Sequence, residues 1–222
     1  MTHSSGSNVQ GRGIIPPQDT VQDDLVRPSS QSHLPMVGAE EVAELAARFG
    51  NPQHCTFSIQ ADEYIYSYRW RKDSDRRAEV VFAIGDAQGR VWVHAKSHYP
   101  SHIFRLPSGG IHWDEPVEAA LLREVEEETH LTVSIRQFVG IIEYRFQRYD
   151  STVLFASYVF LLDSDGAIPQ PGGGEMISEF RAILPCQLSQ VALDLRNLIG
   201  DRRAWGQWRA LAHDLVHDHL CG

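Results

Sequence analysis

The stretch LPSGGIHWDEPVEAALLREVEEETHL, residues 106–131, decides the fold class of this chain. Its paired glycines, Gly109 and Gly110, permit tight turns and a close approach of main chain to a ligand. Pro116 suits the first turn of a helix, where its missing N–H costs nothing, so we expect a helix from about Pro116 to Thr129. The apolar positions of this helix form one stripe that can lie against a sheet, namely Val117, Ala120, Leu121 and Val125.

Three glutamates of this helix share one face. Glu124, Glu127 and Glu128 stand at positions i, i+3 and i+4, so their carboxylates emerge within a single turn and repel one another. Arg123 can neutralise part of this charge, and a bound cation would neutralise more. Hard oxygen ligands at this density suit Mg²⁺ or Mn²⁺ better than zinc. The alternative is a solvated acidic helix face with a purely structural role.

The spacing of these residues resembles the Nudix box, G-x5-E-x7-R-E-U-x-E-E-x-G-U, where U is a bulky apolar residue. Gly109 begins the match, Glu115 follows, and Leu131 ends it. His130 stands where the family has glycine, at the end of the helix, and we expect it to adopt the left-handed conformation. The resemblance implies an α/β fold, an α/β/α sandwich around a mixed sheet, here with an N-terminal helix-strand extension.

The resemblance also implies roles for individual residues. The metal ligands would be Glu124, Glu127 and Glu128, and the main-chain carbonyl of Ser108 would also contact the metal. Glu115 would assist through water or a salt bridge. Arg123 would orient the glutamates.

The general base differs among relatives. Glu124 is the first choice in this chain, and Glu175 and Glu179 are the alternatives. Glu175 ranks ahead of Glu179, because residues 172–174 are glycines that would let a loop close over a substrate.

The implied activity is metal-dependent hydrolysis of a pyrophosphate bond in a nucleoside diphosphate linked to another moiety. Candidate substrates are nucleotide sugars, ADP-ribose, dinucleoside polyphosphates and modified nucleoside triphosphates. A catalytically silent, nucleotide-sensing module is the alternative, although such proteins typically lose box glutamates and this chain keeps them. An isoprenoid diphosphate isomerase is a third option, but the cysteine that such enzymes carry near the box is not evident here.

The chain has four expected parts. Composition and periodicity predict a polar tail at residues 1–38, an extension at 39–76 and a C-terminal helix at 201–222, and the resemblance implies a Nudix domain at 77–200. The pattern predicts helices at 39–49, 187–198 and 202–220, and strands at 64–70, 79–84, 90–95, 133–142 and 153–162. The order of helices and strands lacks the regular βαβ period, which favours a mixed sandwich.

Composition narrows the partners. A net charge of −9 argues against broad binding to nucleic acid, and no apolar run is long enough to span a membrane. The N-terminus lacks the apolar region of a signal peptide, which favours a cytoplasmic protein. Cys55, Cys186 and Cys221 are far apart and are expected to be reduced thiols. A homodimer is one option for the assembly.

Several aromatic and histidine residues have two interpretations. Tyr64, Tyr66, Tyr68 and Trp70 could form a base-stacking platform, but a packed strand face is favoured. Packing is also favoured for Trp205 and Trp208 over a nucleobase clamp, and for Tyr144, Phe146 and Tyr149 over base stacking. His213 and His217 stand four residues apart like a metal pair, but a solvated helix face is favoured.

Overall fold

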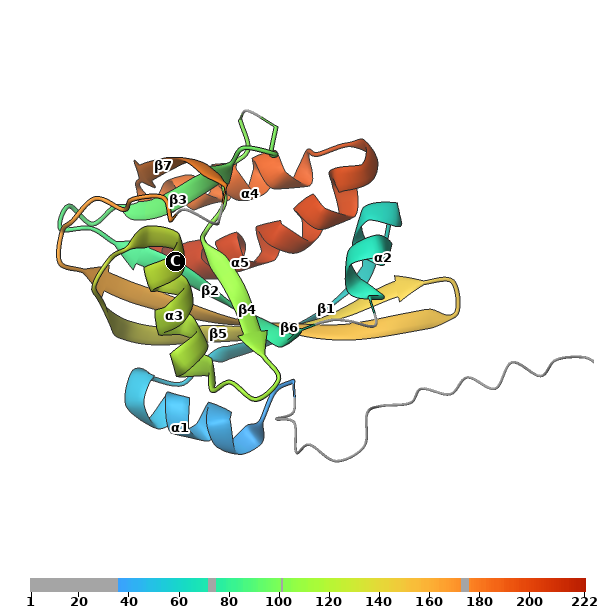
Figure 1. Cartoon of the computed structure of the whole chain (residues 1–222), viewed down its shortest axis with the longest axis horizontal. Helices are drawn as coiled ribbons and strands as arrows, with labels where there is room; N and C mark the ends of the chain where they lie inside the picture. The colour runs from blue at the N-terminus through green and yellow to red at the C-terminus, as the bar shows by residue number, and fades with distance from the viewer. Residues whose placement is uncertain (1–35, 72–74, 101, 173–175) are drawn as a thin grey trace, which may run out of the picture. The chain divides into compact units, whose positions relative to one another are not determined.

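The computed structural model describes residues 36–71, 75–100, 102–172 and 176–222 (Figure 1). Residues 1–35 of the predicted tail lie outside this part of the chain. The described strands are β1 (Gln53–Gln60), β2 (Arg76–Gly85), β3 (Val91–Lys96), β4 (Ser108–His112), β5 (Val133–Arg148), β6 (Ser151–Ser164) and β7 (Ile177–Ile183). The described helices are α1 (Ala39–Phe49), α2 (Glu63–Arg69), α3 (Val117–Thr129), α4 (Leu188–Arg196) and α5 (Arg203–Cys221), with short 3₁₀ turns at Pro185–Gln187 and Gly200–Arg202.

The strands form one mixed sheet. Its order is β1-β5-β6-β2-β3-β7, and β4 pairs with β2. β1 is parallel to β5 and β2 is parallel to β6, whereas the remaining pairs are antiparallel. The mixed sheet confirms the predicted fold class.

Helices cover both faces of the sheet because β2 alternates apolar residues between them. Val80 and Phe82 join the core beneath α1 and α3. Val81 and Ala83 join the core beneath α2, α4 and α5. Figure 1 shows α3 and α1 on one side of the sheet and α5 with α4 on the other. The result is the expected α/β/α sandwich.

The prediction of a strand at residues 64–70 is wrong, because Glu63–Arg69 form the helix α2. Asp62 caps this helix by accepting a hydrogen bond from the Ile65 N–H (3.0 Å), and Ile65 is fully buried. Tyr64 and Tyr68 satisfy a two-residue alternation, but they are also four residues apart and therefore share one helix face. The strand in this region is β1, which the alternation did not reveal.

The other predicted elements hold with shifted ends. β5 and β6 run beyond residues 142 and 153, and together form a long hairpin whose turn includes Tyr149, with φ of 50°. β4 lies where the sequence pattern predicted no strand. Among the described helices, none combines the length and apolar character needed to cross a bilayer.

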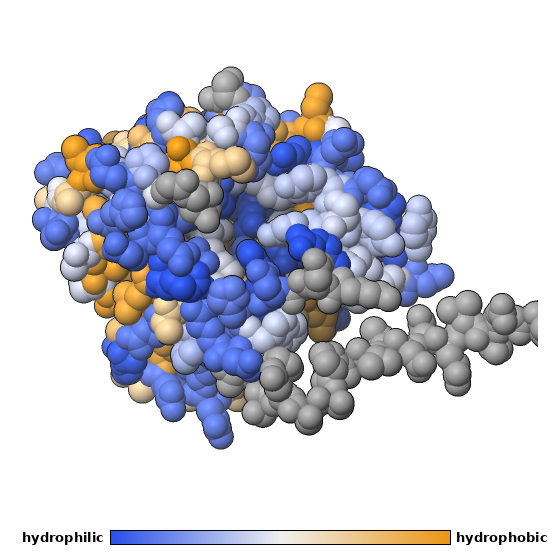
Figure 2. Space-filling view, viewed as in Figure 1, coloured by the Kyte–Doolittle hydropathy of each residue, from blue (hydrophilic) through white to orange (hydrophobic). Residues whose placement is uncertain are grey.

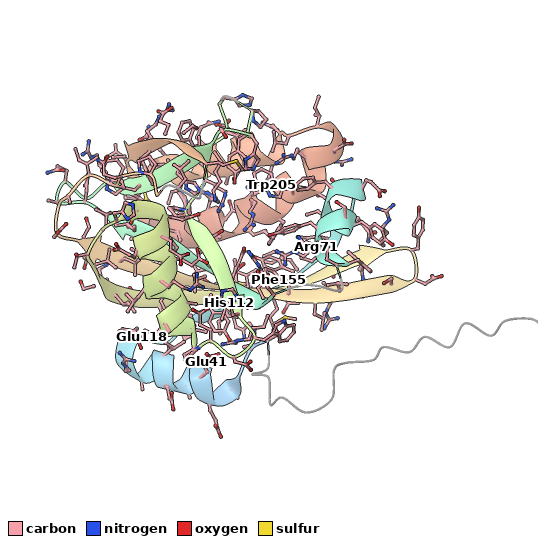
Figure 3. The ribbon with its side chains drawn as sticks, viewed as in Figure 1. Glu41, Arg71, His112, Glu118, Phe155 and Trp205 are labelled. Carbon is pink, nitrogen blue, oxygen red and sulfur yellow. A yellow bond between two sulfur atoms is a disulfide. The ribbon has the colours of Figure 1, made fainter. Side chains whose placement is uncertain are left out.

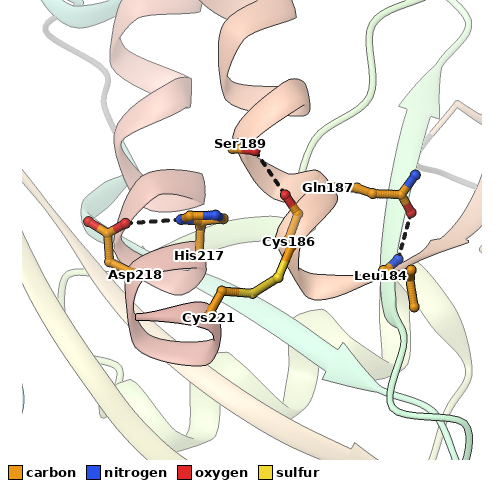
Figure 4. The surroundings of a disulfide bond; sticks show 7 residues. All are labelled: Leu184, Cys186, Gln187, Ser189, His217, Asp218 and Cys221. Atoms are coloured by element: carbon orange, nitrogen blue, oxygen red, sulfur yellow. Dashed lines mark hydrogen bonds and ion pairs between the residues drawn. A yellow bond between two sulfur atoms is a disulfide. The ribbon is translucent and has the colours of Figure 1, made fainter.

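The expectation of reduced cysteines is wrong for two of the three. Cys186 and Cys221 form a disulfide that joins the turn before α4 to the end of α5, with 5.9 Å between their Cα atoms (Figure 4). Cys55 is a free thiol. The pair is 35 residues apart in sequence, and only the antiparallel packing of α4 and α5 brings the two residues together.

Candidate active site

Gly109 lets β4 and α3 approach each other closely. A Cβ at this position would lie 1.7 Å from the carboxyl carbon of Glu124, so no other residue fits there without displacing that side chain. Glu124 is buried as a result. The first glycine of the box and Glu124 therefore pack as one unit.

Arg123 holds three of the box carboxylates. Its guanidinium donates to both oxygens of Glu115 (2.8 and 2.9 Å), to Glu124 (2.9 Å) and to Glu127 (3.2 Å). It also donates to the main-chain oxygen of Gly110 (2.8 Å). The hydrogen bonds to Glu115, followed by those to Glu124, raise the pKa of Arg123 above its usual range despite burial. Arg123 thus contacts Glu115, Glu124 and Glu127 at once.

Glu115 occupies the salt-bridge position. Burial alone would raise the pKa of its carboxyl, but the hydrogen bonds from Arg123 and from the His112 N–H (3.1 Å) outweigh burial and lower this pKa. Glu115 is therefore ionised at neutral pH and fixes the N-terminal side of α3 to the end of β4.

Glu128 faces a different partner from Glu124 and Glu127. It is almost fully buried and lies 3.1 Å from Lys96 Nζ and 3.9 Å from Nδ1 of the buried His94 on β3. Burial, assisted by the charges of Arg105 and Lys96, lowers the pKa of His94 well below its usual value. His94 is thus a neutral imidazole, and Lys96 provides the positive charge opposite Glu128.

The donor chemistry of these residues fits a hard divalent cation. Glu124 and Glu127 both bond to one nitrogen of Arg123, so their carboxylates lie side by side on α3. Half of the Glu127 side chain is exposed, which leaves it accessible to an ion from solvent. Across the part of the chain that the structure describes, no three His, Cys, Asp or Glu side chains converge as a preformed metal cage. Arg123 and Lys96 neutralise part of the negative charge of these carboxylates, and a bound cation would neutralise more of it.

The loop before β7 lies against the end of α3. The Gln170 N–H donates to the carbonyl of Thr129 (3.0 Å), and a Cβ on Gly172 would lie 1.9 Å from the carbonyl oxygen of Glu127. Glu175, which shortly follows Gly172, lies outside the described residues. Glu179 is on β7, is exposed, and pairs with Arg181 (2.8 Å).

A buried carboxylate that the sequence analysis missed is Glu79 on β2. Nη1 of Arg209 donates to both of its oxygens (2.9 and 2.7 Å), and Ser157 donates a further hydrogen bond (2.6 Å). Burial opposes ionisation, but the charges of Arg209 and Arg69 outweigh it and lower the pKa of Glu79. The signal was a lone acidic residue inside the apolar run of β2.

The remaining candidates lie mostly in the core. Trp205, Trp208, Tyr144 and Phe146 are buried, as the packing interpretation predicted, whereas Tyr149 is 92% exposed and packs against little. The expectation of a solvated face for His213 is wrong. Its buried Nε2 accepts the Leu106 N–H (2.8 Å), because α5 crosses the segment that precedes β4.

Comparison with known families agrees with this geometry. The model of the NUDIX domain matches residues 75–204, more than half of the chain. The chain therefore belongs to the Nudix family, which confirms the resemblance of the box.

The individual relatives have low sequence identity to this chain. An ADP-ribose pyrophosphatase of Methanocaldococcus jannaschii is 31% identical over 102 residues, which cover 46% of this chain and 58% of the relative. The chain thus spans a little over half the length of this curated relative. Among solved structures, the E. coli dihydroneopterin triphosphate pyrophosphohydrolase is 17% identical with a TM-score of 0.41, covering 62% of this chain and 98% of its own. An ADP-ribose pyrophosphatase from Streptococcus suis is 16% identical with a TM-score of 0.41, covering 65% and 92%.

Proposed function

We propose that this protein hydrolyses a phosphoanhydride bond in a nucleoside diphosphate linked to another moiety, with Mg²⁺ or Mn²⁺ as cofactor. The observation that carries this proposal is the convergence of three box carboxylates on Arg123 beneath the glycines of β4. Membership of the Nudix family and the similarity to an ADP-ribose pyrophosphatase support it. ADP-ribose, nucleotide sugars, dinucleoside polyphosphates and modified nucleoside triphosphates form the substrate panel.

The box residues have distinct roles in this proposal. Glu124, Glu127 and Glu128 would hold the cation, together with Glu115 and the Ser108 carbonyl. The cation would supply charge shielding at the phosphates and polarise the attacked phosphorus. Arg123 keeps the carboxylates in register through the contacts described above.

The proton of the attacking water would pass to Glu124, the first choice of general base. The water oxygen then bonds to phosphorus as the bridging P–O bond breaks, giving a nucleoside monophosphate and a second phosphorylated product. Glu175 and Glu179 are the alternative bases. The loop at Gly172 lies on α3 beside Glu127, which favours Glu175 of these two.

The proposal includes the wider setting of the site. The partner is a small phosphorylated nucleotide rather than nucleic acid, the location is cytoplasmic, and a homodimer is the assembly to test first. The domain boundaries at residues 38, 76 and 200 are part of the same proposal.

Replacing Glu127 tests the function directly. Release of nucleoside monophosphate from the substrate panel, with Mg²⁺ or Mn²⁺, is compared for wild type, Glu127→Gln and Glu126→Gln. We expect Glu127→Gln to lose about a hundredfold or more in turnover, because it removes a charge that acts in the transition state. Glu126 neighbours Glu127 on α3 and its side chain is 69% exposed, so Glu126→Gln is the matched control and should keep full activity.

Two outcomes would overturn the proposal. Equal turnover by the two variants would remove the box from the chemistry. Metal-dependent binding of a nucleotide by the wild type, without turnover of any substrate, would instead establish the nucleotide-sensing alternative.

A further inference from the structure

Four arginines gather around the buried Glu79, beside the face of β4 opposite to Glu124. This arginine cluster consists of Arg69, Arg76, Arg105 and Arg209. Arg69, Arg76 and Arg105 all lie within electrostatic range of Glu79, and Arg209 binds it directly. Asp75 pairs with Arg76 (3.1 Å). Four positive charges thus gather in one place, in a chain whose net charge is −9.

Arg69 is the least satisfied member of the cluster. Its guanidinium carbon lies 3.5 Å from the ring centroid of Phe155 and 4.4 Å from that of Trp208. These rings attract the cation but accept no strong hydrogen bond. Nε and Nη2 of Arg69 are inaccessible to solvent and have no hydrogen-bond partner among the described residues, and the same is true of Arg209 Nε. Buried donors of this kind normally have an acceptor.

Burial does not neutralise Arg69. Desolvation lowers the pKa of its guanidinium to about 10, and the charges of Arg209 and Arg76 act in the same direction. The side chain is therefore still protonated at neutral pH. The missing element is an acceptor with negative charge.

Space for such an acceptor lies next to the cluster. A cavity of about 80 Å³ is lined by Tyr68, Arg69, Arg71, Asp75 and Arg76. A volume of this size admits several water molecules, and hence a phosphoryl group. Figure 3 places Arg71 beside α2, and the same place in Figure 2 is a strongly hydrophilic surface at the border of a hollow.

β4 connects the cluster with the box. A Cβ on Gly110 would lie 2.9 Å from the guanidinium carbon of Arg76, while the carbonyl of Gly110 accepts a hydrogen bond from Arg123. Ser108 accepts from Arg105 (2.7 Å), and Gly109 faces Glu124. Among the described strands β4 pairs with β2 alone, and its two faces meet the arginine cluster and the box.

We propose that the arginine cluster binds a phosphoryl group of the substrate that lies outside the cleaved phosphoanhydride. This inference rests on the proposed function and narrows it to substrates with three or more phosphoryl groups, such as dinucleoside polyphosphates or nucleoside triphosphates. The Arg69 side chain would turn toward the cavity on binding, so that a phosphate oxygen accepts from its guanidinium group, and Arg76 would add charge. Planar guanidinium groups suit this geometry better than ammonium groups do.

Binding of inorganic phosphate to metal-free protein tests the site without catalysis. Calorimetric titration in the presence of a chelator compares wild type, Arg69→Met and Arg136→Gln. We expect Arg69→Met to raise the Kd for phosphate about tenfold or more, because charge-assisted hydrogen bonds are lost. Arg136 is a half-exposed arginine on β5 that pairs with Asp163, so Arg136→Gln removes one charge elsewhere and should leave the Kd unchanged.

Equal affinity of wild type and Arg69→Met, or no saturable binding by wild type, would overturn the inference. If Arg69→Met does not fold in a urea titration, Arg69→Lys takes its place. Lysine keeps the charge but cannot present two N–H donors in one plane, so phosphate affinity should still fall severalfold. An unchanged Kd in this variant would also overturn the inference.

Kinetic measurements distinguish a failure of this inference from a failure of the proposed function. Arg69→Met should raise KM for a substrate with three phosphoryl groups, with little change in kcat and with KM for ADP-ribose unaffected. If Glu127→Gln abolishes turnover while Arg69→Met changes neither KM nor phosphate affinity, only the inference fails. If phosphate affinity depends on Arg69 but no substrate is cleaved by wild type, only the proposed function fails.

Discussion

At the scale of single residues, the contact between Gly109 and Glu124 restricts the site. The glycine is required by space rather than by backbone angle, because a Cβ would overlap the Glu124 carboxyl group. Glutamate position and glycine identity are therefore coupled.

Gly109→Ala should reduce turnover about a hundredfold, because it would displace Glu124, the proposed general base, and a shift of about an ångström in such a group has effects of this size. Nucleoside monophosphate release and Mg²⁺ titration measure the effect. Gly85→Ala on β2 is the control, since its Cβ would meet its nearest neighbour, the Leu162 carbonyl, at an ordinary 3.5 Å. Full activity of Gly109→Ala would show that Glu124 has room to move.

At the scale of elements, α3 ends on a residue that replaces the glycine of the box. His130 adopts the expected left-handed conformation, with φ of 53° and ψ of 27°, and its N–H bonds to the carbonyl of Glu126 (3.0 Å). This backbone region disfavours residues that carry a Cβ.

His130→Gly should therefore exceed His130→Ala in free energy of unfolding by about 1 kcal/mol. Both variants remove the imidazole, which lies 3.6 Å from Glu126, so their difference isolates the backbone term. Urea denaturation measures it. A glycine variant no more stable than the alanine variant would show that the helix end relaxes without strain.

α5 carries a buried histidine that makes stability depend on pH. Burial, opposed by the hydrogen bond with the Arg209 carbonyl and assisted by the charges of Arg105 and Arg209, lowers the pKa of His213 from an ordinary value of 6.5 to about 3. Between these two values the unfolded chain binds a proton that the folded chain does not. His213 therefore stabilises the fold fully above pH 6.5, and this contribution falls as the pH drops toward 3.

The free energy of unfolding should decrease by about 1.4 kcal/mol per pH unit for this one proton below pH 6. His213→Gln keeps an acceptor for the Leu106 N–H and should flatten the slope by up to one proton. The buried His94 acts with the same sign, so some slope remains. His217→Gln, on the same helix, is the control. An unchanged slope in His213→Gln would contradict the buried, neutral state of this histidine.

At the scale of the whole molecule, the disulfide cross-links the C-terminal helices α4 and α5. Cys186 precedes α4 and Cys221 ends α5, so the bond links the start of one helix to the end of the other (Figure 4).

Reduction, or the change Cys221→Ser, should lower the free energy of unfolding by about 2–4 kcal/mol, the usual effect of closing a loop of this length. Cys55→Ser removes the free thiol and should have little effect. Peptide mapping without reductant should find Cys186 linked to Cys221. Three reactive thiols in the protein unfolded without reductant would contradict the bond.

The whole molecule also separates two kinds of charge across one strand. Glu124 and Glu127 lie on α3, whereas α2, β2 and α5 supply Arg69, Arg76 and Arg209 of the cluster on the other side of β4. No stretch of sequence reveals this, since Glu79 and Arg209 are 130 residues apart and meet only when α5 lies across the sheet.

The sequence by itself determined the box. Spacing along one helix places Glu124, Glu127 and Glu128 on one face and puts His130 at the helix end, because these relations depend on hydrogen bonds between residues a few positions apart. The sequence pattern also predicted the helix α3 and the strands β2, β3, β5 and β6.

Only the tertiary structure decided the rest. Residues 63–69 suit both a strand and a helix, and burial of Ile65 together with the Asp62 cap selects the helix. Asp62 also accepts a hydrogen bond from the Ala204 N–H (2.8 Å). The helical conformation of residues 63–69 therefore depends in part on α5, which lies far along the chain. The disulfide, the buried Glu79 and the arginine cluster arise in the same way, from contacts between distant segments that local patterns do not encode.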